Sequence, residues 1–346
     1  MKPSGIGGQA VLEGIMMKNK EKYAVAVRKP DKEIELKVDE YKGITKGNKI
    51  LNLPFIRGVF NFIDSLILGM KTLIYSADFY EDEDEVEVKP GDKVADSLFK
   101  EKAESVMIGV TVFISVIIAI GLFMVLPTII AGFFEKQFNI LSAGLVSAIE
   151  GIVRITLFLI YVVLISFMKD IQRTYMYHGA EHKCINCIEH GNELTVENVM
   201  KSSRLHRRCG TSFLLFVMII SIILFMFIRV DGMVLKIVTR LLLVPVVAGI
   251  SYEIIRLAGR SDALIVRIIS APGLLLQRLT TKEPDEDMVE VAIAAVEAVF
   301  DWKQYLEEYE AELDAEMEES EESDSEENET SDEFDDENAE DDEDDV

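Results

Sequence analysis

Long runs of apolar residues dominate the middle of the chain and predict about four membrane-crossing helices. The run 105–134 has thirty residues without a charge, and a helix needs about 20 residues to cross the hydrocarbon core of a bilayer. Three further runs follow it, at 138–168, 209–228 and 234–255. The last run contains Pro245 and Gly249, so a buried or re-entrant helix is the alternative there. We therefore expect an all-α membrane protein whose transmembrane bundle occupies 105–256.

One of these runs contains two charged residues. Glu150 and Arg154 lie four residues apart in the run 138–168, which places them on the same face of a helix. Charged side chains inside a membrane are costly, and they almost always pair or face the interior of the bundle. We expect an ion pair between these two residues, turned away from lipid.

Two other apolar stretches carry regularly spaced charges and predict amphipathic helices that lie in the membrane interface. In the stretch 50–75, Arg57, Asp64 and Lys71 recur every seven residues, so they form one polar stripe along an α-helix. The stretch 263–279 likewise mixes basic residues with Leu and Ile. Both patterns are typical of helices that rest on a membrane surface or along a bundle without crossing.

The negative charge of the chain is concentrated near its C-terminus. The chain has a net charge of −26, and residues 304–346 contain 25 Asp or Glu and no Lys or Arg. Like charges repel, and such a segment has little apolar surface to bury, so we expect an acidic disordered tail. The nearly neutral remainder argues against a nucleic-acid-binding protein. The expected parts are an N-terminal cytoplasmic region, the bundle, interfacial or cytoplasmic helices and the tail, at 1–104, 105–256, 257–303 and 304–346.

Basic residues in the loops predict the orientation of the chain in the membrane. The loop between the second and third apolar runs contains seven of them: Lys169, Arg173, Lys183, Lys201, Arg204, Arg207 and Arg208. Loops rich in Lys and Arg stay in the cytoplasm, so we expect a multi-pass protein of the cell membrane with both termini cytoplasmic. Arg204, Arg207 and Arg208 could also bind an anionic lipid headgroup, although topology alone places basic residues at such a boundary.

The candidate chemistry of the chain lies in that same loop, 169–209. All four histidines and all three cysteines fall within one stretch of 32 residues. Imidazole and thiolate groups are the side chains that bind zinc and similar metals. The loop therefore predicts a site for a divalent metal, zinc before others. The residues are His178, His182, His190, His206, Cys184, Cys187 and Cys209.

Within this cluster, residues 178–182 read H-x-x-E-H. On a helix His178 and His182 share one face and can hold a metal together, while Glu181 can act as a general base beside it. His206 and Cys209, at the other end of the loop, are candidate third and fourth ligands. Cys184 and Cys187 form a single C-x-x-C, which favours two incidental thiols over a zinc half-site or redox pair.

A glycine-rich motif lies near the N-terminus. Gly5, Gly7, Gly8 and Gly14 surround Glu13, and glycine allows backbone conformations and close approaches that other residues do not. One hypothesis is a flexible loop that folds over the metal site, with Glu13 as an extra ligand or base. The alternative is an interfacial turn packed against the bundle.

Taken together, the motifs resemble the YqhQ-like family of bacterial multi-span membrane proteins (domain of unknown function family 1385). They are GGQAVLEGIMM (7–17), YHGAEHK (177–183), RLHRRCGTSF (204–213) and AGISYE (248–253). The family is described, by prediction, as metal-dependent enzymes of unknown function. The resemblance implies that the matching positions belong to a site: Glu13, His178, Glu181, His182, His206, Cys209 and Glu253, with Lys183, Arg204 and Arg208 in the same motifs.

Two functions of different classes are compatible with these observations. The first is a metal-dependent membrane enzyme, hydrolytic in type, with its site at the cytoplasmic membrane face and Glu181 polarising a water molecule. The second is a non-catalytic membrane scaffold or assembly factor in which the His/Cys cluster fixes the loop. A closed set of four ligands indicates the second, and a set with an open position indicates the first.

Overall fold

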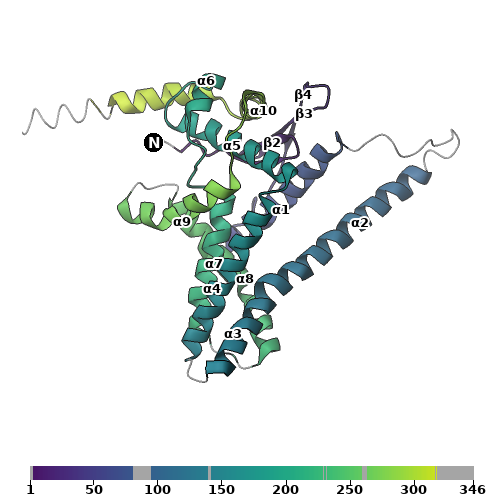
Figure 1. Ribbon diagram of the computed structural model, residues 1–346. Coiled ribbons are helices and arrows are strands. Elements are labelled where there is room, and N and C mark those ends of the chain that lie inside the picture. The colour runs from purple at the N-terminus through teal and green to yellow at the C-terminus, as the bar shows by residue number, and fades with distance from the viewer. Residues whose placement is uncertain are drawn as a thin grey trace, which may run out of the picture.

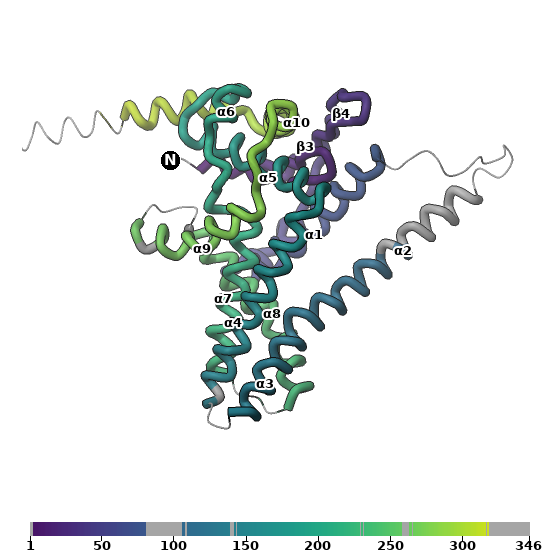
Figure 2. The backbone as a smooth tube through the Cα atoms, viewed as in Figure 1, coloured from purple at the N-terminus to yellow at the C-terminus, as the bar shows by residue number. Residues whose placement is uncertain are grey.

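The computed structural model describes residues 3–80, 95–138, 142–228, 230, 232–258, 263–315 and 317. A mixed head of strands and helices lies at one end of the molecule, and a bundle of long helices extends from it (Figure 1). The N-terminal strands lie in the head, as Figure 2 shows. The predicted all-α membrane fold is confirmed in its main part, but the head also contains a β-sheet.

A four-stranded antiparallel sheet occupies the N-terminal region, where no strand was expected. Its strands pair in sequence order: β1 (Gly7–Val11), β2 (Gly14–Asn19), β3 (Lys22–Arg28) and β4 (Ile34–Glu40). The glycine-rich motif is therefore a hairpin rather than a flexible loop. Glu13 sits in its two-residue turn at a φ of 48°, a left-handed conformation of the kind that tight hairpins need.

Three helices complete the head. These are α5 (Lys169–Glu189), α6 (Val196–Lys201) and α10 (Glu286–Glu297). Two of them, α5 and α10, pack against this sheet, and the third, α6, packs against those two. One hydrophobic core joins them, and it includes Ile15 and Met17 of the sheet, Ile185 of α5 and Val289 of α10. Cys184 and Cys187 are buried free thiols in the same core. Their packing agrees with incidental thiols.

Among the described residues, five helices are long and apolar enough to cross a membrane, which makes this a multi-pass membrane protein. Four of them fall in the four predicted runs. One continuous helical stretch comprises α2 (Ala95–Ile120), the π-helix η1 (Gly121–Val125) and α3 (Leu126–Phe138). The other three are α4 (Ala143–Ile165), α7 (Gly210–Phe227) and α8 (Met233–Ala258), which continues through Pro245.

The fifth helix, α1 (Ile56–Ala77), is the predicted amphipathic one. Each charge of its stripe has a partner. Arg57 pairs with Glu253 of α8, Asp64 accepts hydrogen bonds from Tyr41 and from the backbone of Ile44, and Lys71 lies 3.7 Å from Asp39. At its far end Ser76 accepts a hydrogen bond from the backbone N–H of Leu12. The N-terminal half of α1 therefore packs against α8, and the head covers the half from Asp64 to Ser76.

A second amphipathic helix, α9 (Leu264–Thr280), occupies the other predicted interfacial stretch. It packs against α7 and lies across the bundle near the head (Figure 1). Gly273 of α9 lies directly against Ser212 of α7. This crossing brings the C-terminal end of α9 to the junction between bundle and head.

The expected ion pair inside the bundle is present, and it has a third member. Arg154 donates to Glu150 at 3.0 Å, and Arg240 of α8 also pairs with both oxygens of that carboxylate. Thr128 of α3 completes the cluster by contacting Glu150 and Arg240. The pairing joins α3, α4 and α8 in the interior of the bundle.

The start of the predicted acidic tail is folded, which corrects its boundary. Residues 302–315 are helical, and Tyr305 and Leu306 are buried in the core of the head. Burial of these two side chains stabilises the segment by more than the repulsion between the acidic residues that follow them destabilises it. The remainder of the predicted tail, 318–346, lies outside the described residues.

Candidate metal centre

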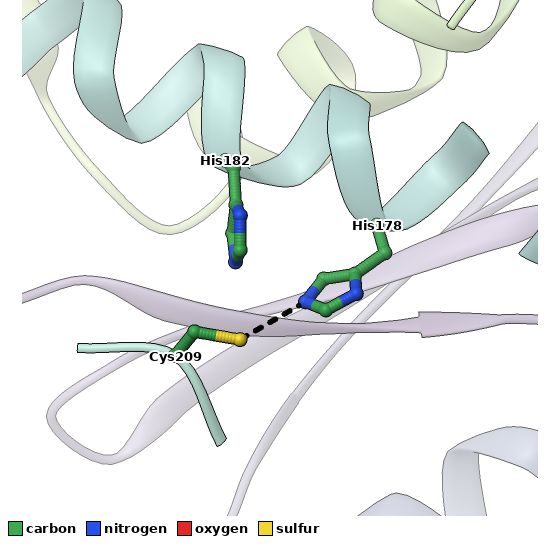
Figure 3. Close-up of side chains that lie close together, drawn as sticks. All are labelled: His178, His182 and Cys209. Carbon is green, nitrogen blue, oxygen red and sulfur yellow. Dashed lines mark hydrogen bonds between the residues drawn. The ribbon is translucent and has the colours of Figure 1, made fainter. Parts of the chain in front are cut away.

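The candidate metal centre lies where the head meets the bundle. Helix α5 begins at Lys169, three residues after the last turn of α4, and it carries His178 and His182 one helical turn apart. Cys209 is the N-cap residue of α7. The three side chains point toward one another from these two helices (Figure 3).

The spacing of the donor atoms suits a metal ion. One ligand atom from each of His178, His182 and Cys209 lies within 4.8 Å of the others. The Sγ atom of Cys209 is 3.3 Å from Nε2 of His178, and the two imidazole centroids are 4.4 Å apart. Zinc–sulfur bonds are about 2.3 Å and zinc–nitrogen bonds about 2.0 Å, so a separation near 3.3 Å matches neighbouring ligands of one ion.

Backbone carbonyls fix the orientation of both imidazoles. The Nδ1 atom of His178 lies 2.9 Å from the carbonyl oxygen of Thr280, and that of His182 lies 2.7 Å from the carbonyl oxygen of Arg204. A carbonyl can only accept, so Nδ1 carries the proton in each ring and Nε2 presents its lone pair. Metal-binding histidines are held by their other nitrogen in this manner.

Hydrogen bonds from Thr211 orient the Cys209 sulfur. The Oγ1 atom of Thr211 is 2.9 Å from Sγ, and its backbone N–H donates at 3.4 Å. The N-terminus of α7 adds the positive end of a helix dipole. The Thr211 contacts fix the position of Sγ, 3.3 Å from Nε2 of His178.

Glu181 is buried one turn after His178, close enough for their charges to interact, and Gly8 of the sheet lies against it. The backbone N–H of Gly8 donates to the carboxylate, and burial nevertheless raises the pKa of Glu181 above its usual value of 4.5. A Cβ atom at Gly8 would be only 2.7 Å from the Met16 carbonyl and 3.0 Å from Cγ of Glu181. The glycine motif of β1 therefore serves close packing around Glu181.

Glu13 belongs to a different cluster. Arg173 pairs with both of its carboxylate oxygens, and the hydroxyl of Tyr177 donates to it at 3.4 Å. These contacts anchor the hairpin turn to α5 one turn before His178. The Glu13 carboxylate is not part of the His178, His182 and Cys209 group. Its role as an extra ligand or base stays a prediction.

His206 lies beside the group and faces another partner. Its Nε2 atom is 3.4 Å from Oε2 of Glu189, and its ring centroid is 5.7 Å from that of His182. Burial lowers the pKa of His206, which keeps the imidazole mainly neutral at neutral pH. Burial alone would raise the pKa of Glu189, but hydrogen bonding to His206 and the charge of Arg208 outweigh it and hold this pKa at about 2.

The other predicted site residues have contacts within the protein. Buried Lys183 donates to the carbonyls of Met200 and Ser202 at the end of α6, which satisfies carbonyls that a helix end leaves open. Arg204 donates to the carbonyl of Thr281. Lys183 and Arg204 also pair with Glu283, Arg208 pairs with Glu189, and Glu253 pairs with Arg57.

Several residues that shape the centre were not predicted. Gln277, fully buried on α9, accepts from the backbone N–H of His206 and donates to its carbonyl and to Ser212. Thr280 acts through its carbonyl, as does Arg204. Gly179 lets the chain at Lys282 pass directly against α5. Only Gly179 carried a signal in the sequence, because it interrupts a helical motif at a cost of about 1 kcal/mol.

Comparisons with known proteins place the chain in a family. Residues 53–302 match the family described as "Protein of unknown function (DUF1385)", which includes all three residues of the group. The chain is also 36% identical over 293 residues to a Bacillus subtilis (strain 168) protein described as "Uncharacterized protein YqhQ"; the match covers 84% of this chain and 91% of that protein. No solved structure matches. The resemblance read from the motifs is therefore confirmed, and the chain belongs to the DUF1385 family.

Proposed function

We propose that this membrane protein is a metal-dependent hydrolase whose site lies at the cytoplasmic face of the cell membrane. The observation that carries the proposal is the convergence of His178, His182 and Cys209, with both Nε2 atoms left as acceptors by the backbone carbonyls on Nδ1. Two imidazoles and one thiolate are a donor set that suits zinc. Three protein ligands leave a fourth position for water or substrate.

The proposed reaction needs a Lewis acid, supplied by the metal, and a proton-transfer group, supplied by Glu181. A divalent metal held by His178, His182 and Cys209 would supply Lewis-acid chemistry toward a substrate oxygen or a water molecule. Glu181 is buried within electrostatic range of His178, and burial raises its pKa. In the proposed reaction it would take a proton from the attacking water and return it to the leaving group. Thr280 and Arg204 hold the imidazoles in place through their carbonyls.

The proposed orientation places the head in the cytoplasm. The basic residues of α5 and of the segment before α7 lie on the head side of the bundle, as the rule for cytoplasmic loops requires. Four helices then cross and return both termini to the same side. We place the fifth, α1, in the interface because its polar stripe of Arg57, Asp64 and Lys71 runs along the helix, and the head contacts it from Asp64 to Ser76.

The proposed role of Arg204, Arg207 and Arg208 toward an anionic headgroup stays a prediction. Arg204 contacts Thr281 and Glu283, and Arg208 contacts Glu189. A headgroup would have to share these side chains with their internal partners. The metal centre does not depend on this contact.

Replacing Glu181 by Gln tests the catalytic role. We expect metal-loaded wild type to release p-nitrophenol from p-nitrophenyl phosphate or p-nitrophenyl acetate, and Glu181→Gln to lower that rate by about 100-fold or more while keeping its metal. The matched control is Glu197→Gln, an exposed residue of α6 whose carboxylate pairs with Lys201. Unchanged turnover in Glu181→Gln, or none in the metal-loaded wild type, would remove the hydrolase assignment.

A second function is favoured by one observation. The centre joins α5 to the start of α7 and, through the Thr280 carbonyl, to the end of α9, so a bound metal would also fasten the head to the bundle. In a non-catalytic scaffold the metal would raise thermal stability, and Glu181→Gln would leave every measurable function intact. The same pair of variants therefore distinguishes the enzyme from the scaffold.

A further inference from the structure

A cavity of about 160 Å³ lies in the bundle at the end away from the head. It is lined by residues of α3, α4, α7 and α8, and by Ile228 and Val230 after α7. One water molecule needs about 10–15 Å³ of such space, so the cavity has room for a group the size of phosphate. Its polar lining consists of Glu135, Ser147, Glu150, Lys236, Thr239 and Arg240.

The buried charges at the inner wall of this cavity do not balance. Arg154 and Arg240 share the single carboxylate of Glu150. All three residues are at most 7% exposed, which leaves one positive charge in excess inside the bundle. An uncompensated charge in so apolar a setting is costly. A bound anion would remove that cost.

Two cationic side chains line the cavity, and each has hydrogen-bond donors that lack an acceptor among the described residues. Arg240 uses Nη1 and Nη2 on Glu150 and Thr128, and its Nε atom has no acceptor among the described residues. Lys236 lines the same cavity, and in the described part of the chain no carboxylate lies within ion-pair distance of it. The lining itself is neutral, because Glu135, at the exposed rim, and Glu150 balance Lys236 and Arg240. The one excess positive charge is that of Arg154, which pairs with Glu150.

We propose that this cavity binds the phosphate group of an anionic ligand, with Lys236, Thr239 and Nε of Arg240 as donors. Arginine and lysine are the usual partners of phosphate oxygens. The cavity opens among membrane-crossing helices near their ends, which is the depth at which phospholipid headgroups lie. A phospholipid headgroup and free phosphate share this chemistry, and the experiment separates them.

Native mass spectrometry of the detergent-purified full chain tests the site with two lipids. We expect wild type to retain phosphatidylglycerol in preference to zwitterionic phosphatidylcholine. Lys236→Gln should weaken that retention about fivefold, the effect of one basic residue worth about 1 kcal/mol. The matched control is Lys136→Gln, an exposed lysine of α3 outside the cavity, which should retain the lipid as wild type does.

A second variant tests whether the cavity itself, rather than surface charge, is the site. Ser147→Phe fills the cavity without changing any charge and should abolish retention, whereas Ser115→Phe on the exposed face of α2 should not. A thermal midpoint raised by inorganic phosphate in wild type and not in Lys236→Gln, without lipid retention, would identify a free anion as the ligand. Equal binding of both lipids with no response to phosphate, or full retention in Ser147→Phe, would overturn the site.

Discussion

We expect Gly179→Ala to prevent this protein from accumulating in a folded, metal-binding form. A Cβ atom at this position would lie directly against the carbonyl oxygen of Lys282. That backbone cannot yield easily, because the N–H of Lys282 donates to the carbonyl of Tyr175 at 2.9 Å. Forcing the two chains apart should cost at least about 3 kcal/mol. It would also draw the Thr280 carbonyl away from His178.

The measurement is the yield of monodisperse protein in detergent, with metal content determined on any folded fraction. Gly210→Ala is the matched control, since it also stands one residue from a proposed ligand and its added Cβ meets open space. Alanine is also the better helix former, so the control should be at least as stable as wild type. A well-folded, metal-binding Gly179→Ala would show that the contact between α5 and the chain at Lys282 is not required.

The second large effect is expected inside the bundle. Glu150→Gln should destabilise the protein strongly, because it leaves Arg154 and Arg240 buried in the bundle without their shared carboxylate. Removing one partner from a buried ion pair costs about 3–5 kcal/mol. We expect the thermal midpoint in detergent to fall by roughly 10 °C.

Glu135→Gln provides the comparison for Glu150→Gln. Glu135 lines the same cavity, but it is exposed, and exposed charges contribute about 1 kcal/mol or less. The thermal midpoint of Glu135→Gln should stay within a few degrees of that of wild type. Equal midpoints for Glu150→Gln and wild type would mean that the cluster is not what holds α4 and α8 together.

The membrane-crossing helices could be predicted from the sequence because a long apolar run without charged residues is nearly sufficient to define such a helix. The sheet could not be predicted as readily. Its strands are short, and the turn at Glu13 lacks the Asn-Gly or Asp-Gly signal of tight hairpins. The strand β4, IELKVDE, does alternate apolar and charged residues, which is the pattern of a strand with one covered face. That alternation was the signal in the sequence from which the sheet could have been predicted.

The candidate site was predictable only where residue type carries the chemistry. His178 and His182 follow from their spacing on a helix, and Cys209 follows from its place beside the third apolar run. The carbonyls of Thr280 and Arg204 could not be found, because a backbone carbonyl is the same at every residue and its position depends on the tertiary fold. Arg240 joins Glu150 across 90 residues of sequence, and no local pattern links them.

Metal content of the detergent-purified chain, determined by elemental analysis, tests the proposed centre most directly. We predict about one equivalent of zinc or a similar divalent metal per chain in wild type and in His190→Ala, whose histidine lies outside the group. The metal should be lost in His178→Ala and in Cys209→Ser. No metal in wild type, or the same amount in all four proteins, would contradict a metal centre at His178, His182 and Cys209.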